Sequence, residues 1–226
     1  MSICGEEAFS GCKELKVVSM PDGIDGIGPS AFYKCEQLNN VYVPDSVLSV
    51  GDAAFCSCKK LRRIAVRNGV LNMGTSAFAD CSMLLSVDRF SQSDARYPFD
   101  VVGDYSFAGT SLAKVNLSLR SSSIYTFWGD YCFADCKSLA EVNILSSCYM
   151  SNHMFANDTA LTAVNFKNNH TSYVYPFVFE NCTSLPQITL PSKIWYVSEG
   201  MFHNCSSLRT VKFSDYTTAN SMVSLV

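Results

Sequence analysis

The chain has 226 residues, of which 48% are hydrophobic and 16% charged, and its formal net charge is -3. This composition suits a large buried core, and the weak negative charge gives no electrostatic footprint for nucleic acid or an anionic membrane. No apolar run is long enough for a transmembrane helix, and the first residues lack the basic and apolar regions of a signal peptide. We therefore expect no nucleic acid partner and no membrane insertion within this segment.

A phenylalanine recurs along the whole chain and defines the period of a repeat. The steps between successive copies are 23, 23, 23, 29, 26, 22, 24 and 23 residues. A period in the twenties is typical of a solenoid with short coils, and leucine-rich repeats fall in this range. These anchor residues are Phe9, Phe32, Phe55, Phe78, Phe107, Phe133, Phe155, Phe179 and Phe202.

Other residue types keep a constant distance from the anchor. Leucine stands six residues after it in eight copies, whereas the fifth copy is one residue shorter and has Leu112 at plus five. Alternating apolar residues such as Val41 and Val43 then predict a short strand with one buried face. A second apolar pair lies eight and five residues before the anchor. Glycine follows at minus four in six copies, which indicates a tight bend.

The second and third copies show this pattern most completely, in the stretches IGPSAFYKCEQLNNVYVP and VGDAAFCSCKKLRRIAV. They resemble the BspA-type (Treponema-type) leucine-rich repeat, whose consensus is close to LxxIxIPxxVxxIGxxAFxxCxxL. The resemblance covers essentially the whole chain. We therefore expect a repeat solenoid, a leucine-rich repeat array of about nine coils of 22–29 residues. Short parallel strands would form one face, and short extended or helical pieces the other.

We expect residues 1–226 to form a single leucine-rich repeat solenoid domain. Met1 falls at a repeat position, eight residues before the first anchor, so the chain starts inside a repeat without a polar cap. This favours a fragment of a longer protein.

The family resemblance implies a noncatalytic protein that is displayed on a cell surface or secreted. Members of the family are typically surface proteins implicated in adhesion to host proteins or to other cells. The expected partner is therefore a protein ligand, such as a host or matrix protein. The alternative is a cytoplasmic protein-interaction scaffold, and the sequence does not indicate an oligomeric state.

Eleven cysteines in a short secreted chain would ordinarily suggest disulfides, but their repeat positions favour another interpretation. Seven stand three residues after an anchor. We interpret these seven, together with Cys4 and Cys132, as small buried hydrophobic residues. Stacked coils would bring the seven so close that distance alone does not exclude a disulfide. Cys56 and Cys148 fall outside the buried pattern and are expected to be the exposed thiols.

The sequence contains no recognisable catalytic or metal-binding motif. The histidines His153, His170 and His203 lie in different coils and form no HExxH pair, and no cysteine pair has a second pair at zinc-finger spacing. We therefore expect no catalytic residue, no metal and no cofactor, with a hydrolase as the most remote alternative. Carboxylates near bends, such as Asp104 and Asp130, are expected to cap backbone groups.

A basic concentration in the third copy is the first candidate binding surface. It is either a solvated rim or a contact for an acidic ligand. Its members are Lys59, Lys60, Arg62, Arg63 and Arg67.

An aromatic column in the last four copies is the second candidate. The position six residues before the anchor becomes aromatic there, and stacked coils would align the rings. Such a column either stabilises the edge of the array or, if exposed, contacts a protein or a carbohydrate. Its members are Phe127, Tyr149, Tyr173 and Tyr196.

The outward positions of the predicted strands form a third candidate, a mixed polar surface that includes Tyr42, Asn143, Asn165 and Lys212. Extra residues after Val87 and Val115 would bulge from one edge of the solenoid. Such insertions either mark a binding face or reflect neutral variation of loops.

Overall fold

The computed structural model describes residues 3–66, 72–87, 100–117, 127–145, 149–167, 173–194 and 196–214. Within these ranges all regular structure is β-strand, and the strands number seventeen. The residue five positions before the anchor lies in a short strand in the first eight copies, so this part of the described coil is extended rather than helical. None of the described residues forms a helix that could cross a bilayer.

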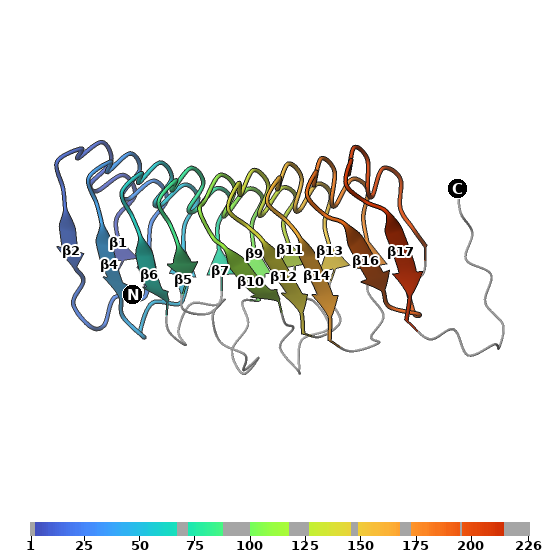
Figure 1. Ribbon diagram of the computed structural model, residues 1–226. Coiled ribbons are helices and arrows are strands. Elements are labelled where there is room, and N and C mark those ends of the chain that lie inside the picture. The colour runs from blue at the N-terminus through green and yellow to red at the C-terminus, as the bar shows by residue number, and fades with distance from the viewer. Residues whose placement is uncertain are drawn as a thin grey trace.

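Two layers of parallel strands run the length of the array, and the chain passes from one layer to the other in every coil (Figure 1). The longer strands form one layer: β2 (Val17–Ser19), β4 (Asn40–Val43), β6 (Arg63–Val66), β8 (Ser86–Val87), β10 (Lys114–Leu117), β12 (Glu141–Ile144), β14 (Ala163–Phe166), β16 (Gln187–Leu190) and β17 (Thr210–Phe213). Their outward side chains form what we call the strand face. The expected solenoid with parallel strands is confirmed.

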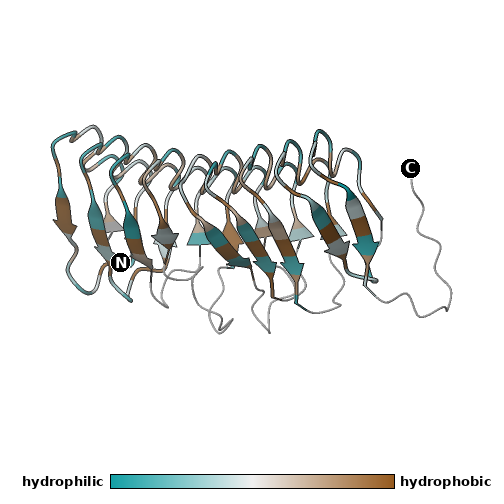
Figure 2. Ribbon diagram, viewed as in Figure 1, coloured by the Kyte–Doolittle hydropathy of each residue, from teal (hydrophilic) through white to brown (hydrophobic). Residues whose placement is uncertain are grey.

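Two-residue strands form the second layer: β1 (Ile3–Cys4), β3 (Gly26–Ile27), β5 (Ser49–Val50), β7 (Asn72–Met73), β9 (Val101–Val102), β11 (Phe127–Trp128), β13 (Tyr149–Met150) and β15 (Tyr173–Val174). Each is followed by turns that carry the anchor and lead into the next longer strand. These turns line one edge of the array, the upper edge in Figure 1, which we call the turn edge. Apolar and polar residues alternate along the longer strands (Figure 2), so each strand buries one side and exposes the other.

The anchor phenylalanines form a continuous stack through the core. Seven of them, from Phe32 to Phe179, have no exposed surface. From Phe9 to Phe202, centroids of neighbouring rings lie 5.1–5.8 Å apart, and their planes are within 9° of parallel. Phe9, in the first coil, is 40% exposed, because no coil covers its outer side among the described residues. The repeat therefore places one ring per coil at a spacing close to that of the strands.

The contacts of the cysteines three residues after the anchor show why this residue recurs. The Cys58 thiol donates a hydrogen bond to the carbonyl oxygen of Phe32, the anchor of the preceding coil, with Sγ and O 3.1 Å apart. The same bond joins Cys35 to Phe9 at 3.1 Å. Burial raises the pKa of the Cys35 thiol to about 11, which keeps the donor protonated at neutral pH. These cysteines are hydrogen-bond donors between coils as well as small buried residues.

Three cysteine expectations need correction, because Cys12 is not buried, Cys4 is only half-buried and Cys56 is not exposed. The described cysteines are all free thiols, so the possible disulfide within the column does not occur among them. Cys12 is exposed rather than buried, because it belongs to the first coil and its column continues on one side only. Cys56 is half-buried, and Cys148 lies outside the described residues.

Asp158 replaces cysteine in the seventh copy and is fully buried. Its Oδ1 accepts a hydrogen bond from the backbone N–H of Cys136 at 2.8 Å. Its Oδ2 is buried without a hydrogen-bond partner among the described residues. Burial raises the pKa of this carboxyl well above its ordinary value, because the charged form loses its hydration there.

Five of the six glycines at minus four are required by close packing of coils rather than by a special bend, and Gly5 in the first coil has open space instead. At Gly129 an added Cβ would lie 2.3 Å from the backbone nitrogen of Asp104, and at Gly103 it would lie 2.6 Å from that of Thr75. Positive φ angles occur instead two residues before and two residues after the anchor, as at Tyr131 (57°). The sequence-based interpretation placed the glycine correctly but gave the wrong physical cause.

Candidate functional site

The strand face is divided into three hydrogen-bonded sheets, β2-β4-β6-β8, β10-β12-β14 and β16-β17. In most coils the residue seven after the anchor donates its backbone N–H to the preceding coil. Thr162 donates to the carbonyl oxygen of Ala140 at 3.0 Å, and Arg209 donates to that of Pro186 at 2.9 Å. Pro186 occupies this position in the eighth copy and has no N–H to donate. The proline accounts for the break between β14 and β16.

The second break in the strand face separates β8 from β10. It coincides with the fifth copy, which is one residue shorter after its anchor, although β10 still pairs with β12 along its whole length. Residues 88–99, which contain most of the extra residues before this copy, lie outside the described residues. Residues 118–126, after β10, also lie outside them. The predicted bulges at these two insertions therefore stay predictions.

A hollow of about 630 Å³ lies on the strand face where Pro186 separates β14 from β16. We call it the proline hollow. Its charged lining consists of Lys167 and Lys212, both exposed, and includes no aspartate or glutamate. Neutral polar groups, among them Asn165, Gln187 and Thr189, supply further donors and acceptors. The chain as a whole is acidic, so this local positive charge departs from its average.

A second hollow of about 600 Å³ lies at the other break, beside β8 and β10. It contains Leu85, which is 59% exposed, and both signs of charge. Lys114 Nζ lies 3.0 Å from Glu141 Oε1, and hydrogen bonds from Lys114 and Asn143 lower the pKa of this carboxyl. The lining of the second hollow also includes Lys167, so it carries two lysines and one glutamate, whereas the proline hollow carries two lysines and no acidic side chain.

Asparagine side chains form a ladder across β10, β12 and β14. Asn143 Nδ2 donates to Asn116 Oδ1 at 2.8 Å, and Asn165 Nδ2 donates to Asn143 Oδ1 at 3.0 Å. Asn143 was expected to be outward and available, yet only 5% of it is exposed, because its neighbours in the ladder cover it. Its role on the strand face is to hold the adjacent amides in place.

The other residues predicted for this surface point outward. Tyr42 is 43% exposed, and Asn165 and Lys212 are exposed. They lie in β4, β14 and β17, so the structure places Asn165 and Lys212 around the proline hollow and Tyr42 several coils away. Whether they contact a partner stays a prediction.

The aromatic residues at minus six begin the short strands or take the equivalent position, and we call them the minus-six column. Tyr149 and Tyr173 stack at a centroid distance of 4.8 Å. Exposed fractions are 56% for Phe127, 38% for Tyr173 and 46% for Tyr196, and Tyr149 is half-buried. These rings are thus accessible, while stacking covers one face of Tyr149 and one of Tyr173.

The basic concentration of the third copy lies at the turn edge and at the start of β6. The described members, Lys59, Lys60, Arg62 and Arg63, are all exposed. Lys60 Nζ donates to Gln37 Oε1 at 2.6 Å. Arg67 lies outside the described residues, so its contribution stays a prediction.

A second aromatic column on the turn edge was not predicted. Tyr105, Tyr131, His153 and Phe177 stand two residues before their anchors, and we call them the minus-two column. Successive centroids lie 4.8, 4.5 and 5.0 Å apart, with planes within 3° of parallel. Reading this repeat position down the copies would have revealed it, because it changes from small or charged residues to rings at the fifth copy.

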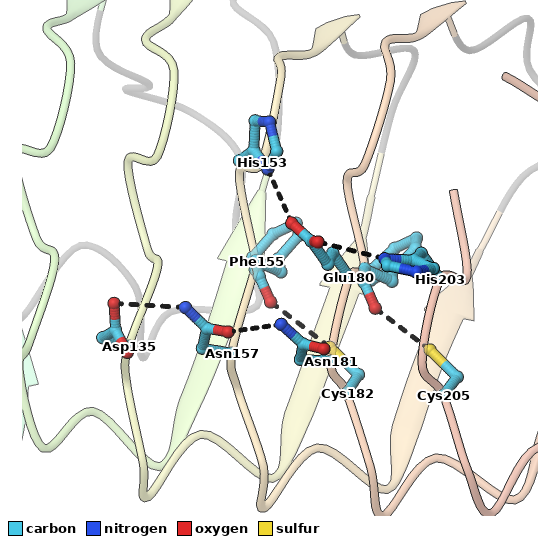
Figure 3. Close-up of polar contacts among 10 residues, drawn as sticks. Asp135, His153, Phe155, Asn157, Glu180, Asn181, Cys182, His203 and Cys205 are labelled. Carbon is cyan, nitrogen blue, oxygen red and sulfur yellow. Dashed lines mark hydrogen bonds and ion pairs between the residues drawn. The ribbon is translucent and has the colours of Figure 1, made fainter. Parts of the chain in front are cut away.

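Glu180 links this column to the next coils (Figure 3). Its Oε2 lies 3.0 Å from His153 Nδ1, and its Oε1 lies 3.1 Å from His203 Nδ1. A parallel amide ladder runs beside it, in which Asn181 Nδ2 donates to Asn157 Oδ1 at 2.8 Å. The turn edge of the last coils is therefore held by its own polar contacts, which gives it a structural role.

The capping role predicted for the carboxylates near the bends is confirmed for Asp104 and Asp130. Asp104 Oδ1 accepts the backbone N–H of Asp130 at 2.8 Å, and Asp130 Oδ1 accepts that of Asn152 at 3.0 Å. Among the described residues no group of three or more His, Cys, Asp and Glu side chains is placed to hold a metal ion.

Stacked anchors, parallel strands and an uncovered polar strand face define a leucine-rich repeat solenoid. The family model described as the BspA type leucine rich repeat region matches residues 1–94 and 100–222, with six copies. The chain belongs to this family. A search of curated proteins finds no match.

Solved structures show the same fold. The crystal structure of a leucine rich repeat protein from T. pallidum has a TM-score of 0.53 and 23% identity, with coverage of 82% of this chain and 72% of that chain. A leucine-rich repeat protein from Eubacterium ventriosum has a TM-score of 0.56 and 18% identity, over 93% of this chain and 47% of that chain. At these identities the likeness concerns the fold alone.

Proposed function

We propose that this chain is a noncatalytic cell-surface protein that binds another protein through its strand face. The supporting observation is that the strand face carries ordered side chains and that no other described element covers it (Figure 1). In a folded protein, such a surface of polar residues with isolated exposed apolar groups is suited to contact with another protein.

The side chains of the strand face are held in place before a partner arrives. Successive strands place equivalent residues about 4.8 Å apart. The amide ladder from Asn116 to Asn165 and the ion pair of Lys114 with Glu141 restrict their rotamers further. Binding to a preorganised surface loses less side-chain entropy, which favours affinity.

The location at the cell surface and the role in adhesion rest on the family. The chain belongs to the BspA type, and the resemblance of its repeats implies surface display and adhesion to host proteins or other cells. These two statements are testable without knowledge of the ligand. Antibody against the chain should label intact source cells as strongly as permeabilised ones, and labelling only after permeabilisation would contradict surface display.

Binding is tested with the recombinant chain on intact host cells and on immobilised matrix proteins. We expect saturable binding, weakened at least about tenfold when Tyr42→Ser and Asn165→Ala are combined, since central polar and aromatic contacts each contribute about 1–2 kcal/mol. A matched variant, Lys13→Ser with Glu14→Ser, changes two exposed residues of the turn edge and keeps the net charge. Equal loss in both variants would contradict the strand face as the binding surface.

A further inference from the structure

The proline hollow differs from the rest of the strand face in three respects. A break in the strand ladder forms it, a pair of lysines lines it, and its lining contains no acidic side chain. The second hollow also lies at a break, but there Glu141 accompanies Lys114. Lys167 lines both hollows and helps to lower the pKa of Glu141, whereas Lys212 lines the proline hollow alone. Of these two hollows, the proline hollow therefore has the larger excess of positive charge in its lining.

We propose that the proline hollow binds an extended acidic segment of a partner protein, whose carboxylates pair with Lys167 and Lys212. This inference rests on the proposed function, because it assigns a partner chemistry to one part of the strand face. Both ammonium groups are donors without acceptor capacity, so carboxylate oxygens satisfy them directly.

The positions of the two lysines set the spacing of the carboxylates. Lys212 in β17 lies two strands from β14, and Lys167 follows β14 directly, two positions beyond Asn165. Two strand spacings and two residues of rise place their backbones roughly 12 Å apart. An extended segment rises about 3.3 Å per residue and turns alternate side chains to opposite faces, so acidic residues four positions apart match this distance on one face.

The uncharged lining of the hollow favours a peptide. The amides of Asn165 and Gln187 and the hydroxyl of Thr189 can exchange hydrogen bonds with a peptide backbone. Pro191 and the partly buried Phe166 add apolar surface for alternate side chains of an extended segment. A sulfated oligosaccharide would require a denser array of cations than two lysines supply, so we regard it as the competing outcome.

The test uses two synthetic nine-residue peptides in a threonine and valine background. One carries two glutamates four positions apart, and its twin carries glutamine at both positions. Fluorescence anisotropy at low salt should show the glutamate peptide binding at least about tenfold more tightly, because charge-assisted bonds are the stronger ones. The ratio should shrink at high salt, since both lysines are exposed and screened.

Substitutions of the two lysines test whether the glutamate peptide binds in the proline hollow. Lys167→Gln and Lys212→Gln should each weaken the glutamate peptide about three- to tenfold, and together they should abolish its advantage over the twin. Lys34→Gln removes an exposed lysine of the turn edge and should leave binding unchanged. Thermal unfolding of each variant is the control for retention of the fold.

Three results would overturn the proposal. The first is equal affinity for both peptides, and the second is an equal loss in Lys34→Gln. The third is a sulfated oligosaccharide that binds more tightly than the glutamate peptide and is lost in the double lysine variant. If the chain still binds cells or matrix proteins in any of these cases, the acidic segment is excluded while the proposed function stands.

Discussion

The first four coils and the last five share one scaffold and differ in what they place on it. From β2 to β8 the strands form one ladder, the cysteine column is uninterrupted, and the minus-two positions hold Glu7, Ser30, Ala53 and Ser76. In the last five coils the strand face is broken, and the column contains Thr110 and Asp158. Rings occupy the minus-two positions of the first four of these coils, and the last coil has Gly200 there. The anchor stack continues through both regions almost unchanged.

The coils stay in phase through both regions, because the anchor stack and the backbone hydrogen bonds between successive turns continue where the strand face is broken. Neighbouring coils contact each other through the phenylalanine rings and the strands, so local departures elsewhere do not disturb the array. The later coils are therefore the part of the molecule in which surface chemistry varies, and the substitutions below test whether each departure adds to or subtracts from stability.

The largest expected effect concerns Asp158. Replacing it with cysteine restores the repeat residue and removes a buried acid, so Asp158→Cys should raise the free energy of unfolding by about 1–3 kcal/mol at pH 7. The pKa of Asp158 is raised in the folded state, so between the unfolded and folded pKa values the native protein binds more protons than the unfolded chain. The stability of the natural chain should therefore fall as pH rises above about 4.

Denaturation with urea at pH 4.5 and pH 7.5 measures this effect. The gain from Asp158→Cys should be greater at pH 7.5, and Thr110→Cys, at the same repeat position in another coil, should show no such pH dependence. The reciprocal change Cys81→Asp should introduce the same pH dependence into the regular region. A gain from Asp158→Cys that is equal at both pH values would contradict the raised pKa.

A smaller effect is expected from the minus-two column. Tyr131 stacks on both Tyr105 and His153, so Tyr131→Ala should lower the free energy of unfolding by about 1–2 kcal/mol. The matched change Ser76→Ala, at the same repeat position in the regular region, removes no ring contact and should be nearly neutral. Thermal and urea unfolding compare the two variants, and similar losses would argue against a stabilising role for the column.

The smallest effect is expected at the break beside the proline hollow. Pro186→Thr supplies the N–H that Thr162 provides one coil earlier, and the new hydrogen bond should contribute about 0.5–1.5 kcal/mol. Greater freedom of the unfolded chain offsets part of this gain. Hydrogen exchange should show a protected amide at residue 186, and the glutamate peptide should bind more weakly as β14 and β16 join. Rapid exchange at this amide would mean that the proline does not cause the break.

Much of the fold could be predicted from the sequence, because the physics of a solenoid repeats with its period. The anchor, the following leucine and the alternating valines identify each coil by themselves. The break at Pro186 was also within reach, since a residue without an N–H occupies a position where other coils donate one. The burial of Asn143 was not, because it depends on amides of two neighbouring coils that must first be placed in register.

The candidate site was harder to predict than the fold. Lys212 and Asn165 are named correctly as outward residues, but the hollow between them arises from the separation of two strands, which no single repeat contains. Lys167 and Lys212 face the same hollow because of this separation of β14 and β16. A surface built by a departure from the repeat is visible only once the regular copies have been aligned and stacked.

The buried thiols bear on the kind of environment that the protein can withstand. Oxidants and other thiols must reach a sulfur atom, preferably as the thiolate, before they can modify it. The thiols of Cys58, Cys81 and Cys182 have no exposed surface, and burial raises their pKa. Their sulfurs are therefore shielded from chemistry outside the folded chain. A cysteine-rich sequence of this kind can stay reduced in an oxidising medium, so its cysteine content is no argument for a cytoplasmic location.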